Sequence, residues 1–372
     1  MKRDMLSWSH APARDFTGVS LPERSTQSPS RVWVVRSVCG LALGFTNGES
    51  SVVAGWVSLP GVENVTPLDQ ISMAVHSVDS TIQGPHGSIP VRWYSPPTGT
   101  AHLRSATIVW IHGGGFFKGN LDQPESHDVA RTLAAAGFTV VTVGYRLATF
   151  SRFRRSPRGI GWSPAVHYPI PVDDVVAVVR EVQREAPNGV ILGGASAGAC
   201  LSAGAVLRMA DEKNDPLVGV FFAYGFFHAA LPKRSPDLRG RLRGRRRFVH
   251  TPMLLNLTNL HYAGTRTAMA ERHAFAGGHA LHEFPPTLMI DSDRDSMRSS
   301  GGLFAEELSA AGVVVDYHVL PGTFHAFLNR PHESDFTEGM RLIIDWAGKQ
   351  RGSTSHLRVP LADRQPGSTS VG

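Results

Sequence analysis

A serine set among small residues carries the strongest chemical signal in this sequence. The segment GASAG at 194–198 follows a short apolar run at 190–192 and precedes a stretch of small residues with helical character. This is the context of a nucleophile elbow, a strand-to-helix turn so tight that larger neighbouring side chains would collide with the surrounding backbone. The positive end of the following helix dipole favours negative charge that develops beside the serine. We therefore predict that Ser196 is the nucleophile of an acyl-transfer reaction.

A glycine run upstream provides the second part of the same chemistry. HGGGF at 112–116 follows an apolar, strand-like segment. During acyl transfer the carbonyl oxygen becomes negatively charged, and backbone N–H groups can stabilise it when no bulky side chain shields them. We predict that the amides of Gly113, Gly114 and Ala197 form this oxyanion hole. His112 is expected to brace the loop by hydrogen bonding.

The serine also needs a base and an orienting carboxylate, because its hydroxyl is a weak nucleophile until a base takes the proton. Behind a nucleophile elbow, the chain order is serine, acid, histidine. Of the 17 histidines, His325 occupies the loop after an apolar run at 313–320, whereas His318 lies within that run. Spacing alone leaves three candidates for the acid after the run at 287–290, namely Asp291, Asp293 and Asp295.

Short strands and helices that could position these residues alternate along the chain. Apolar and β-branched runs predict strands at 71–78, 89–94, 106–111, 138–143, 190–192, 218–224, 287–290 and 313–320. Helical spacing predicts helices at 126–136, 172–185, 197–209, 303–311 and 338–346, with weaker signals at 254–262 and 265–274. This alternation calls for a mostly parallel central sheet with helices on both faces, so the predicted fold class is α/β.

The alternation also suggests a domain organisation. We expect a catalytic domain over 71–349, interrupted by loop-like insertions at 149–164 and 232–283 that lie above the sheet. Residues 1–70 lack clear periodicity and are expected to form a partly disordered arm that builds a cap together with the second insertion. The Gly-, Ser- and Pro-rich tail at 350–372 is expected to be disordered.

Composition and charge are those of an ordinary globular chain. The 372 residues are 42% hydrophobic and 18% charged. The formal net charge of +6 is concentrated in two arginine clusters, at 152–158 and 239–247, and such blocks are usually solvated. Because no aromatic residues interleave with the second cluster to stack on bases, no nucleic-acid partner is expected.

The sequence predicts no metal, disulfide or membrane element. Cys39 and Cys200 are far apart and have no spacing typical of a disulfide framework or a zinc site. The apolar early segment 32–59 is broken by charged residues and glycines, so no stable membrane insertion is expected. We expect a cytoplasmic protein with a small-molecule partner, and a homodimer is left open.

Taken together, the motifs resemble the hormone-sensitive-lipase-like family of α/β-hydrolase esterases over roughly residues 75–346. The resemblance rests on HGGGF at 112–116, GYRLA at 144–148, PVDD at 171–174, GASAG at 194–198, PPTLMIDSDRDSMR at 285–298 and GTFHAF at 322–327. Placed on the family pattern, the catalytic acid falls on Asp295, which shortly precedes Met297 and Arg298. The resemblance implies an α/β-hydrolase fold, a triad of Ser196, Asp295 and His325, no cofactor, and esters of short to medium acyl chains as substrates.

The chain departs from the family pattern around the pocket. Ala195 replaces the usual Asp or Thr before the nucleophile, Ser299 replaces an acidic residue, and Thr149 and Phe150 replace a Pro-Glu pair. These departures put the substrate in doubt, but they remove no member of the triad.

Apolar pocket contacts are expected from aromatic residues near the motifs, namely Phe116, Phe117, Phe226 and Phe227. An amidase, deacetylase or acyltransferase with the same triad stays open, because the acyl-enzyme chemistry is shared. A non-catalytic ligand-binding protein on the same fold is a further alternative, and His325 speaks against it because such proteins replace that histidine.

Overall fold

The computed structural model describes residues 75–98, 106–156, 159–163, 165–242 and 251–350, all within one compact unit of the chain. The predicted N-terminal arm, the C-terminal tail and most of the second arginine cluster lie outside these residues. Among the described segments, no helix is both long and apolar enough to cross a membrane.

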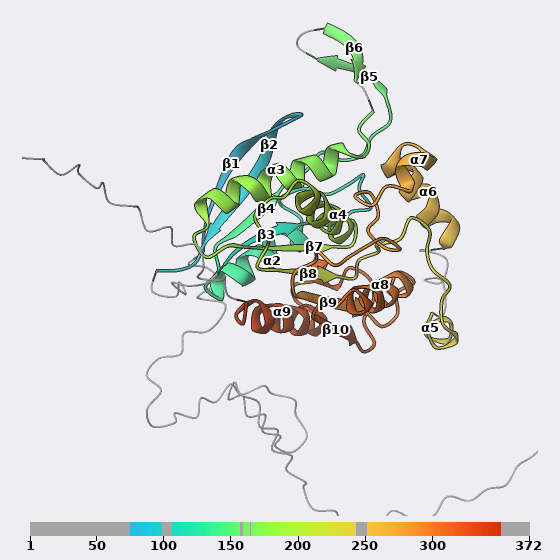
Figure 1. Ribbon diagram of the computed structural model, residues 1–372. Coiled ribbons are helices and arrows are strands. Elements are labelled where there is room, and N and C mark those ends of the chain that lie inside the picture. Colours follow the sequence, from blue (N-terminus) through green and yellow to red (C-terminus); the bar gives the residue numbers. More distant parts are fainter. Residues whose placement is uncertain (1–74, 99–105, 157–158, 164, 243–250, 351–372) are drawn as a thin grey trace, which may run out of the picture. The chain divides into compact units, whose positions relative to one another are not determined.

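An eight-stranded sheet forms the centre of the described unit (Figure 1). Its strand order is β1-β2-β4-β3-β7-β8-β9-β10. The bounds are β1 His76–Gly84, β2 Gly87–Ser95, β3 Thr107–Ile111, β4 Val140–Val143, β7 Val190–Ala195, β8 Gly219–Ala223, β9 Thr287–Ser292 and β10 Val315–Leu320. The two strands at the β1 edge pair antiparallel and the other six run parallel, as the continuous apolar runs of the central strands predict.

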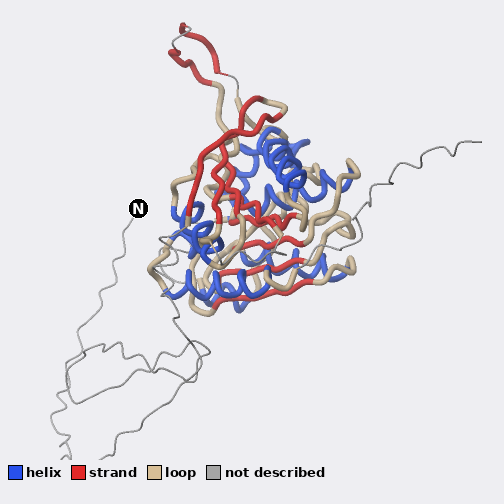
Figure 2. The backbone as a smooth tube through the Cα atoms, turned by 90° about the vertical axis from the view of Figure 1, so that its left-hand side faces the viewer, coloured by secondary structure: helices blue, strands red, loops and turns tan. Residues whose placement is uncertain are grey.

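Helices cover both faces of this sheet (Figure 2). One face packs against α3 (Ile170–Glu185), α4 (Ala197–Asp211) and α8 (Arg298–Ala310). The other face packs against α2 (Pro124–Ala135) and α9 (Ser334–Ala347). Side chains alternate between the two cores along β3, where Val109 faces the first core and Trp110 faces the second. The predicted α/β class, with helices on both faces, is therefore confirmed.

The two insertions contain more regular structure than their composition predicts. The basic stretch expected as a loop forms a separate antiparallel pair, β5 (Arg152–Ser156) and β6 (Gly159–Ser163). Its arginines suggested a solvated loop, but pairing between backbone groups does not depend on side-chain polarity.

The second insertion also differs from the sequence prediction. It contains α6 (Pro252–Ala263) where helical signals were noted, but only a four-residue helix, α7 (Arg266–Met269), in place of the longer one. An unexpected helix, α5 (Pro236–Arg241), begins just before the second arginine cluster and includes its first residues. At its N-terminus the Ser235 hydroxyl accepts a hydrogen bond from the Leu238 N–H. The predicted role of this region as a cap remains a prediction.

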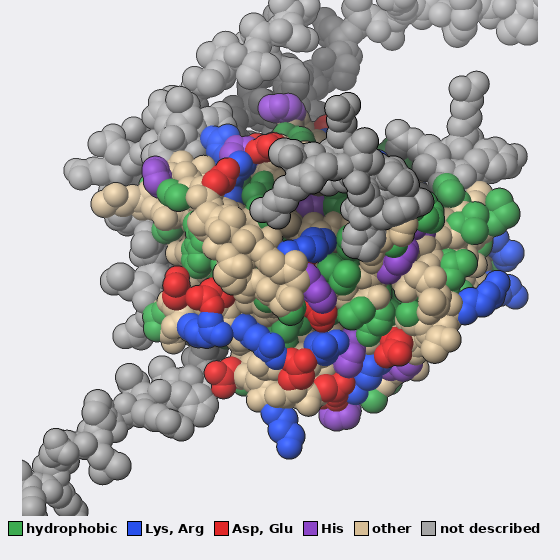
Figure 3. All heavy atoms as spheres, turned by 90° about the horizontal axis from the view of Figure 1, so that it is seen from above, with side chains coloured by type: hydrophobic (Ala, Val, Ile, Leu, Met, Phe, Trp, Pro, Cys, Tyr) green, Lys and Arg blue, Asp and Glu red, His purple; other side chains and the backbone are tan. Residues whose placement is uncertain are grey.

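Charged side chains of both signs are interspersed on the face shown in Figure 3. Opposite charges also pair within the described residues: the Arg92 guanidinium contacts both Asp79 and Asp122. Basic side chains of the described surface are therefore in part paired with acidic ones.

The close packing of α4 makes a testable prediction at Gly204. A Cβ atom there would lie 2.1 Å from the backbone carbonyl oxygen of His273, whereas a Cβ on Gly302 in α8 would meet only the Tyr317 hydroxyl at 3.4 Å. We expect Gly204→Ala to lower the free energy of unfolding by about 1–3 kcal/mol through overpacking. The control Gly302→Ala should raise it by up to ~1 kcal/mol through helix propensity. Urea unfolding midpoints measure both, and equal midpoints would contradict the packing described.

Candidate active site

Ser196 lies at a strained turn between β7 and α4. Its backbone has φ 51° and ψ −117°, a conformation that non-glycine residues rarely adopt. The flanking glycines make the turn possible: a Cβ on Gly194 would lie 2.4 Å from the Gly198 carbonyl oxygen, and one on Gly198 would lie 2.2 Å from that of Ile111. The local geometry is that of the nucleophile elbow predicted from the sequence.

His325 and Asp295 lie beside this serine. The Ser196 hydroxyl is 3.0 Å from His325 Nε2, and His325 Nδ1 is 2.5 Å from Asp295 Oδ2. The three residues follow the carboxyl ends of β7, β9 and β10, which are parallel strands and therefore end at the same edge of the sheet. Of the three aspartates that spacing left open, the structure brings Asp295 to the histidine.

The two other aspartates have separate partners. Asp291 is buried and accepts a hydrogen bond from the Tyr317 hydroxyl at 3.0 Å, and burial raises the pKa of its carboxyl to about 8. Asp293 lies 3.0 Å from the Arg241 guanidinium and 3.3 Å from that of Arg298. Asp291 therefore links β9 to β10, and Asp293 pairs with the two arginines.

The electrostatic surroundings of His325 favour its protonated form. Burial opposes a charge on the imidazole, but the carboxylates of Asp295, Glu125 and Asp291 outweigh burial and raise the pKa of His325. The ring of Tyr224 also meets the imidazole edge-on, with 5.0 Å between centroids. An imidazole in this setting is well placed to accept a proton from the serine.

The glycine loop lies directly against the serine, but its first amide has another partner. The Gly113 N–H donates to Glu125 Oε2 at 2.6 Å, in contrast to its predicted role as an oxyanion donor. The next two glycines have φ values of 125° and 63°, which glycine adopts readily. Within the described residues, the N–H groups of Gly114 and Gly115 have no hydrogen-bond acceptor. The motif alone does not show which of these amides a neighbouring side chain engages.

His112 holds this loop from behind. The Nδ1 atom of the buried ring is 2.7 Å from the Gly113 carbonyl oxygen. The ring also stacks on Tyr145, with 4.6 Å between the ring centroids. Burial lowers the pKa of His112 to about 4, so the ring is neutral at physiological pH. The bracing role predicted for His112 agrees with this hydrogen bond.

One carboxylate of the site was missed by the sequence analysis. Glu125 lies in the first turn of α2, is only 1% exposed, and accepts a hydrogen bond from the Tyr224 hydroxyl as well as from Gly113. A glutamate in a first helical turn is ordinarily read as a helix-dipole partner. Nothing in the local pattern indicates that this one is buried.

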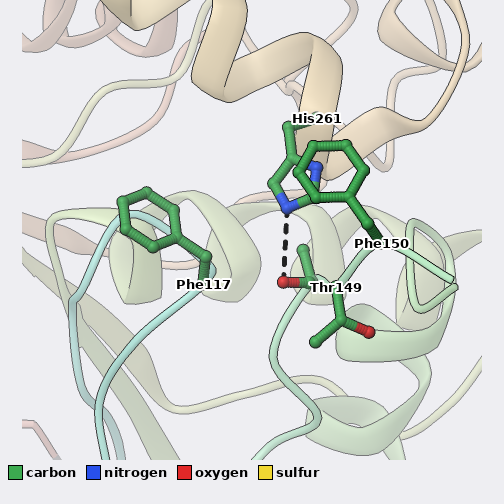
Figure 4. A pocket seen from close by; sticks show the side chains of 5 residues that line it. Phe117, Thr149, Phe150 and His261 are labelled. Carbon is green, nitrogen blue, oxygen red and sulfur yellow. Dashed lines mark hydrogen bonds between the residues drawn. The ribbon is translucent and has the colours of Figure 1, made fainter. Parts of the chain in front are cut away.

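An open, mostly apolar pocket of about 430 Å³ lies beside the loop (Figure 4). Its lining residues are Phe117, Ala148, Thr149, Phe150 and His261. Phe117 faces Phe150 and His261 across the pocket (Figure 4). The ring centroids of Phe150 and His261 are 4.1 Å apart. A Cβ on Gly115 would lie 2.9 Å from the Phe117 ring, so the pocket adjoins the glycine loop.

Of the four phenylalanines predicted to line a pocket, Phe117 does so here. The other three are buried in the core: Phe116 stacks on Tyr262 at 3.9 Å, Phe226 meets Phe116 edge-on, and Phe227 stacks on Phe304 at 4.2 Å. Proximity to a motif in sequence did not distinguish a core ring from a pocket ring.

The chain is similar to known α/β hydrolases and esterases. A family model described as alpha/beta hydrolase fold matches residues 162–329, and a second, BD-FAE, matches residues 93–225. Carboxylesterase NlhH of Mycobacterium tuberculosis is 30% identical over 251 residues, which cover 65% of this chain and 72% of that protein. Esterase LipI of the same species is 28% identical over 278 residues, covering 70% and 78%.

A solved structure shows the same fold. The esterase of Pyrobaculum calidifontis superimposes with a TM-score of 0.62 at 25% identity, covering 75% of this chain and 88% of that one. The chain belongs to the hormone-sensitive-lipase-like family of α/β-hydrolase esterases. The predicted family and the predicted α/β-hydrolase fold are thereby confirmed.

The buried His112 predicts a pH dependence of stability. Its pKa is about 4 in the folded protein and near the ordinary 6.5 in the unfolded chain, so the unfolded chain binds the additional proton between these values. The free energy of unfolding should therefore fall as the pH drops from 6.5 towards 4. His112→Asn keeps a donor for the Gly113 carbonyl and should make this slope shallower by up to ~1.4 kcal/mol per pH unit.

Urea unfolding at several pH values measures this effect. His282→Asn, at a histidine whose side chain is 71% exposed, is the matched control. A slope that is the same in His112→Asn as in the wild type would contradict the burial of a neutral His112.

Proposed function

We propose that this chain hydrolyses carboxylic esters by two-step acyl transfer on Ser196. The observation that carries the proposal is the continuous contact from Asp295 through His325 to Ser196, with 2.5 Å and 3.0 Å between the paired atoms. Asp295 accepts a hydrogen bond from the Nδ1 proton of His325, which leaves Nε2 free of a proton and facing the serine as a base. The Asp295 carboxylate also stabilises the imidazolium that forms when Nε2 takes the proton. Membership in an esterase family agrees with this assignment.

The first step forms an acyl-enzyme. His325 Nε2 takes the proton of Ser196 as the serine oxygen attacks the ester carbonyl carbon, and the carbonyl oxygen becomes an oxyanion. The imidazolium then gives this proton to the leaving alcohol oxygen as the carbon–oxygen bond breaks. In the second step His325 takes a proton from water, the hydroxide attacks the acyl carbon, and Ser196 leaves with the proton as the carboxylic acid is released.

The oxyanion is held by backbone amides of the glycine loop and of α4. Gly114 and Gly115 replace Gly113 in this role, since the Gly113 N–H is occupied by Glu125. Ala197 is the first residue of α4, where an N–H has no acceptor within the helix. Each such donor is typically worth about 3 kcal/mol of transition-state stabilisation.

The pocket beside the loop supports an apolar substituent of modest size on the substrate. A volume of about 430 Å³ lies in the lower part of the range for small-molecule sites, and rings of Phe117 and Phe150 form its walls. These features favour esters of short to medium acyl chains, which we propose as the substrate class.

Removal of the nucleophile gives the first test. We expect Ser196→Ala to abolish hydrolysis of a p-nitrophenyl ester series from acetate to decanoate, because the substitution removes the hydroxyl that lies against His325 and would form the acyl-enzyme. Ser202→Ala, at a second buried serine of the same helix, should retain wild-type turnover. Turnover by Ser196→Ala equal to that of the wild type would refute the proposal, and a wild type that cleaves anilides but not esters would favour an amidase.

The pocket wall gives a second prediction. Phe150→Ala should raise KM for p-nitrophenyl hexanoate several-fold and leave kcat nearly unchanged, because wall contacts are made equally in the ground and transition states. Leu257→Ala, which removes an exposed apolar side chain of α6 that does not line the pocket, is the matched control. An unchanged KM in Phe150→Ala would show that the acyl chain lies elsewhere.

A further inference from the structure

Glu125 is a buried carboxylate at the junction of several segments that carry the reaction. Its Oε2 accepts from the Gly113 N–H at 2.6 Å, and its Oε1 accepts from the Tyr224 hydroxyl at 2.6 Å and from Asn329 Nδ2 at 3.1 Å. Its backbone carbonyl accepts from Trp110 Nε1 at 2.6 Å. One residue thus contacts the glycine loop, the end of β8, the end of β3 and the segment that follows His325.

The orientation of Asn329 is fixed by a second hydrogen bond with the same residue. The Glu125 N–H donates to Asn329 Oδ1 at 3.2 Å, which leaves Nδ2 facing the Glu125 carboxylate. Asn329 ends the short helix η2 (Phe327–Asn329), which begins two residues after His325. The pair therefore connects the start of α2 to the loop that presents the histidine.

The hydrogen-bond partners of this carboxylate favour its charged form. The Gly113 N–H and the Nδ2 group of Asn329 can only donate, and hydrogen bonds to a carboxylate stabilise its charge. Burial acts in the opposite direction and raises the pKa of Glu125, while the nearby His325 lowers it. Tyr224 lies between the two groups, since its hydroxyl contacts Glu125 and its ring contacts the imidazole.

We propose that Glu125 is a positioning residue for ester hydrolysis, which sets the glycine loop through Gly113 and the histidine loop through Asn329 and places a negative charge behind His325. This inference rests on the proposed function. The carboxylate does not touch the reacting atoms, so it acts through the groups that do. By engaging the Gly113 N–H, it also leaves the oxyanion to the next two amides, which have no acceptor within the described residues.

Other charged and titratable groups also face His325 or Glu125 and must be held constant in any test. Around His325 they are Asp295 in the loop after β9, Asp291 in β9, Tyr224 after β8 and Arg330, whose guanidinium is 3.4 Å from the His325 carbonyl oxygen. Around Glu125 they are Tyr224, His325 and Tyr145.

The test compares Glu125→Gln, Asn329→Ala and Asp174→Asn in the full chain. Glu125→Gln keeps the shape and removes the charge, whereas Asn329→Ala keeps the charge and cuts the contact with the histidine loop. Asp174 is a second fully buried carboxylate, held by Arg146, and serves as the control for a purely structural loss. The readouts are kcat, KM and the pH dependence of kcat/KM with a p-nitrophenyl ester, with folding checked by circular dichroism.

We expect Glu125→Gln to lower kcat about tenfold or more with little change in KM, because the loops shift relative to the serine. On the acidic side of the pH profile (the acidic limb), kcat/KM should begin to fall at a lower pH in Glu125→Gln than in the wild type. The reason is that the pKa of His325 falls when a neighbouring negative charge is removed. Asn329→Ala should lower kcat and leave that limb in place. Asp174→Asn should lower stability and leave the pH profile unchanged.

Wild-type kcat and a wild-type acidic limb in folded Glu125→Gln would overturn the inference. If Glu125→Gln does not fold, a wild-type kcat in Asn329→Ala overturns it instead. Wild-type activity is measured first, so that the two proposals can be separated. A wild type without ester hydrolysis contradicts the proposed function, whereas an active wild type with an unaffected Glu125→Gln contradicts the present inference alone.

Discussion

The close approach of three backbone segments at the end of β7 is the constraint on which the site depends. The turn at Ser196 brings the Gly194 and Gly198 backbones together, and Gly198 also lies against the carbonyl of Ile111 at the end of β3. Neither glycine could carry a side chain without moving the strand or helix that it joins. Because β3 continues into the glycine loop, the same approach that forms the turn at the serine also brings the start of that loop, Gly113, next to it. The strained backbone of Ser196 and the position of the glycine loop therefore both follow from the same close packing of β3, β7 and α4.

Local patterns predicted the parts of the fold and site that depend on local constraints. The GASAG segment could be recognised because small residues are required at a tight turn, and the central strands because they are buried on both faces. Asp295 was different, since three aspartates fit the spacing and only the family resemblance selected one of them. Its contact with His325 depends on how two loops meet in space, which no local pattern records.

The features that escaped prediction are those fixed by tertiary contacts. Glu125 is an ordinary first-turn glutamate in sequence, and its burial follows from the packing of α2 beneath the glycine loop. Phe227 lies near β8 in the chain as a pocket residue would, but its ring stacks on Phe304 in the core. The hairpin of β5 and β6 was not predicted, because its arginines indicate a solvent-exposed segment but say nothing about backbone pairing.

Asp293 connects the arginine-rich insertion to the histidine loop. Its carboxylate contacts Arg241 from α5 and Arg298 from α8, and it also accepts the Gly322 N–H at 3.0 Å, three residues before His325. The insertion is therefore not an independent module for protein engineering. Consider a chimaera in which α5 is replaced by the corresponding segment of a relative that has no arginine at position 241. Such a chimaera would lose the cation that pairs with Asp293 beside the loop that bears the histidine. Through Asp293, a residue of this insertion is thus linked to the loop that bears the histidine.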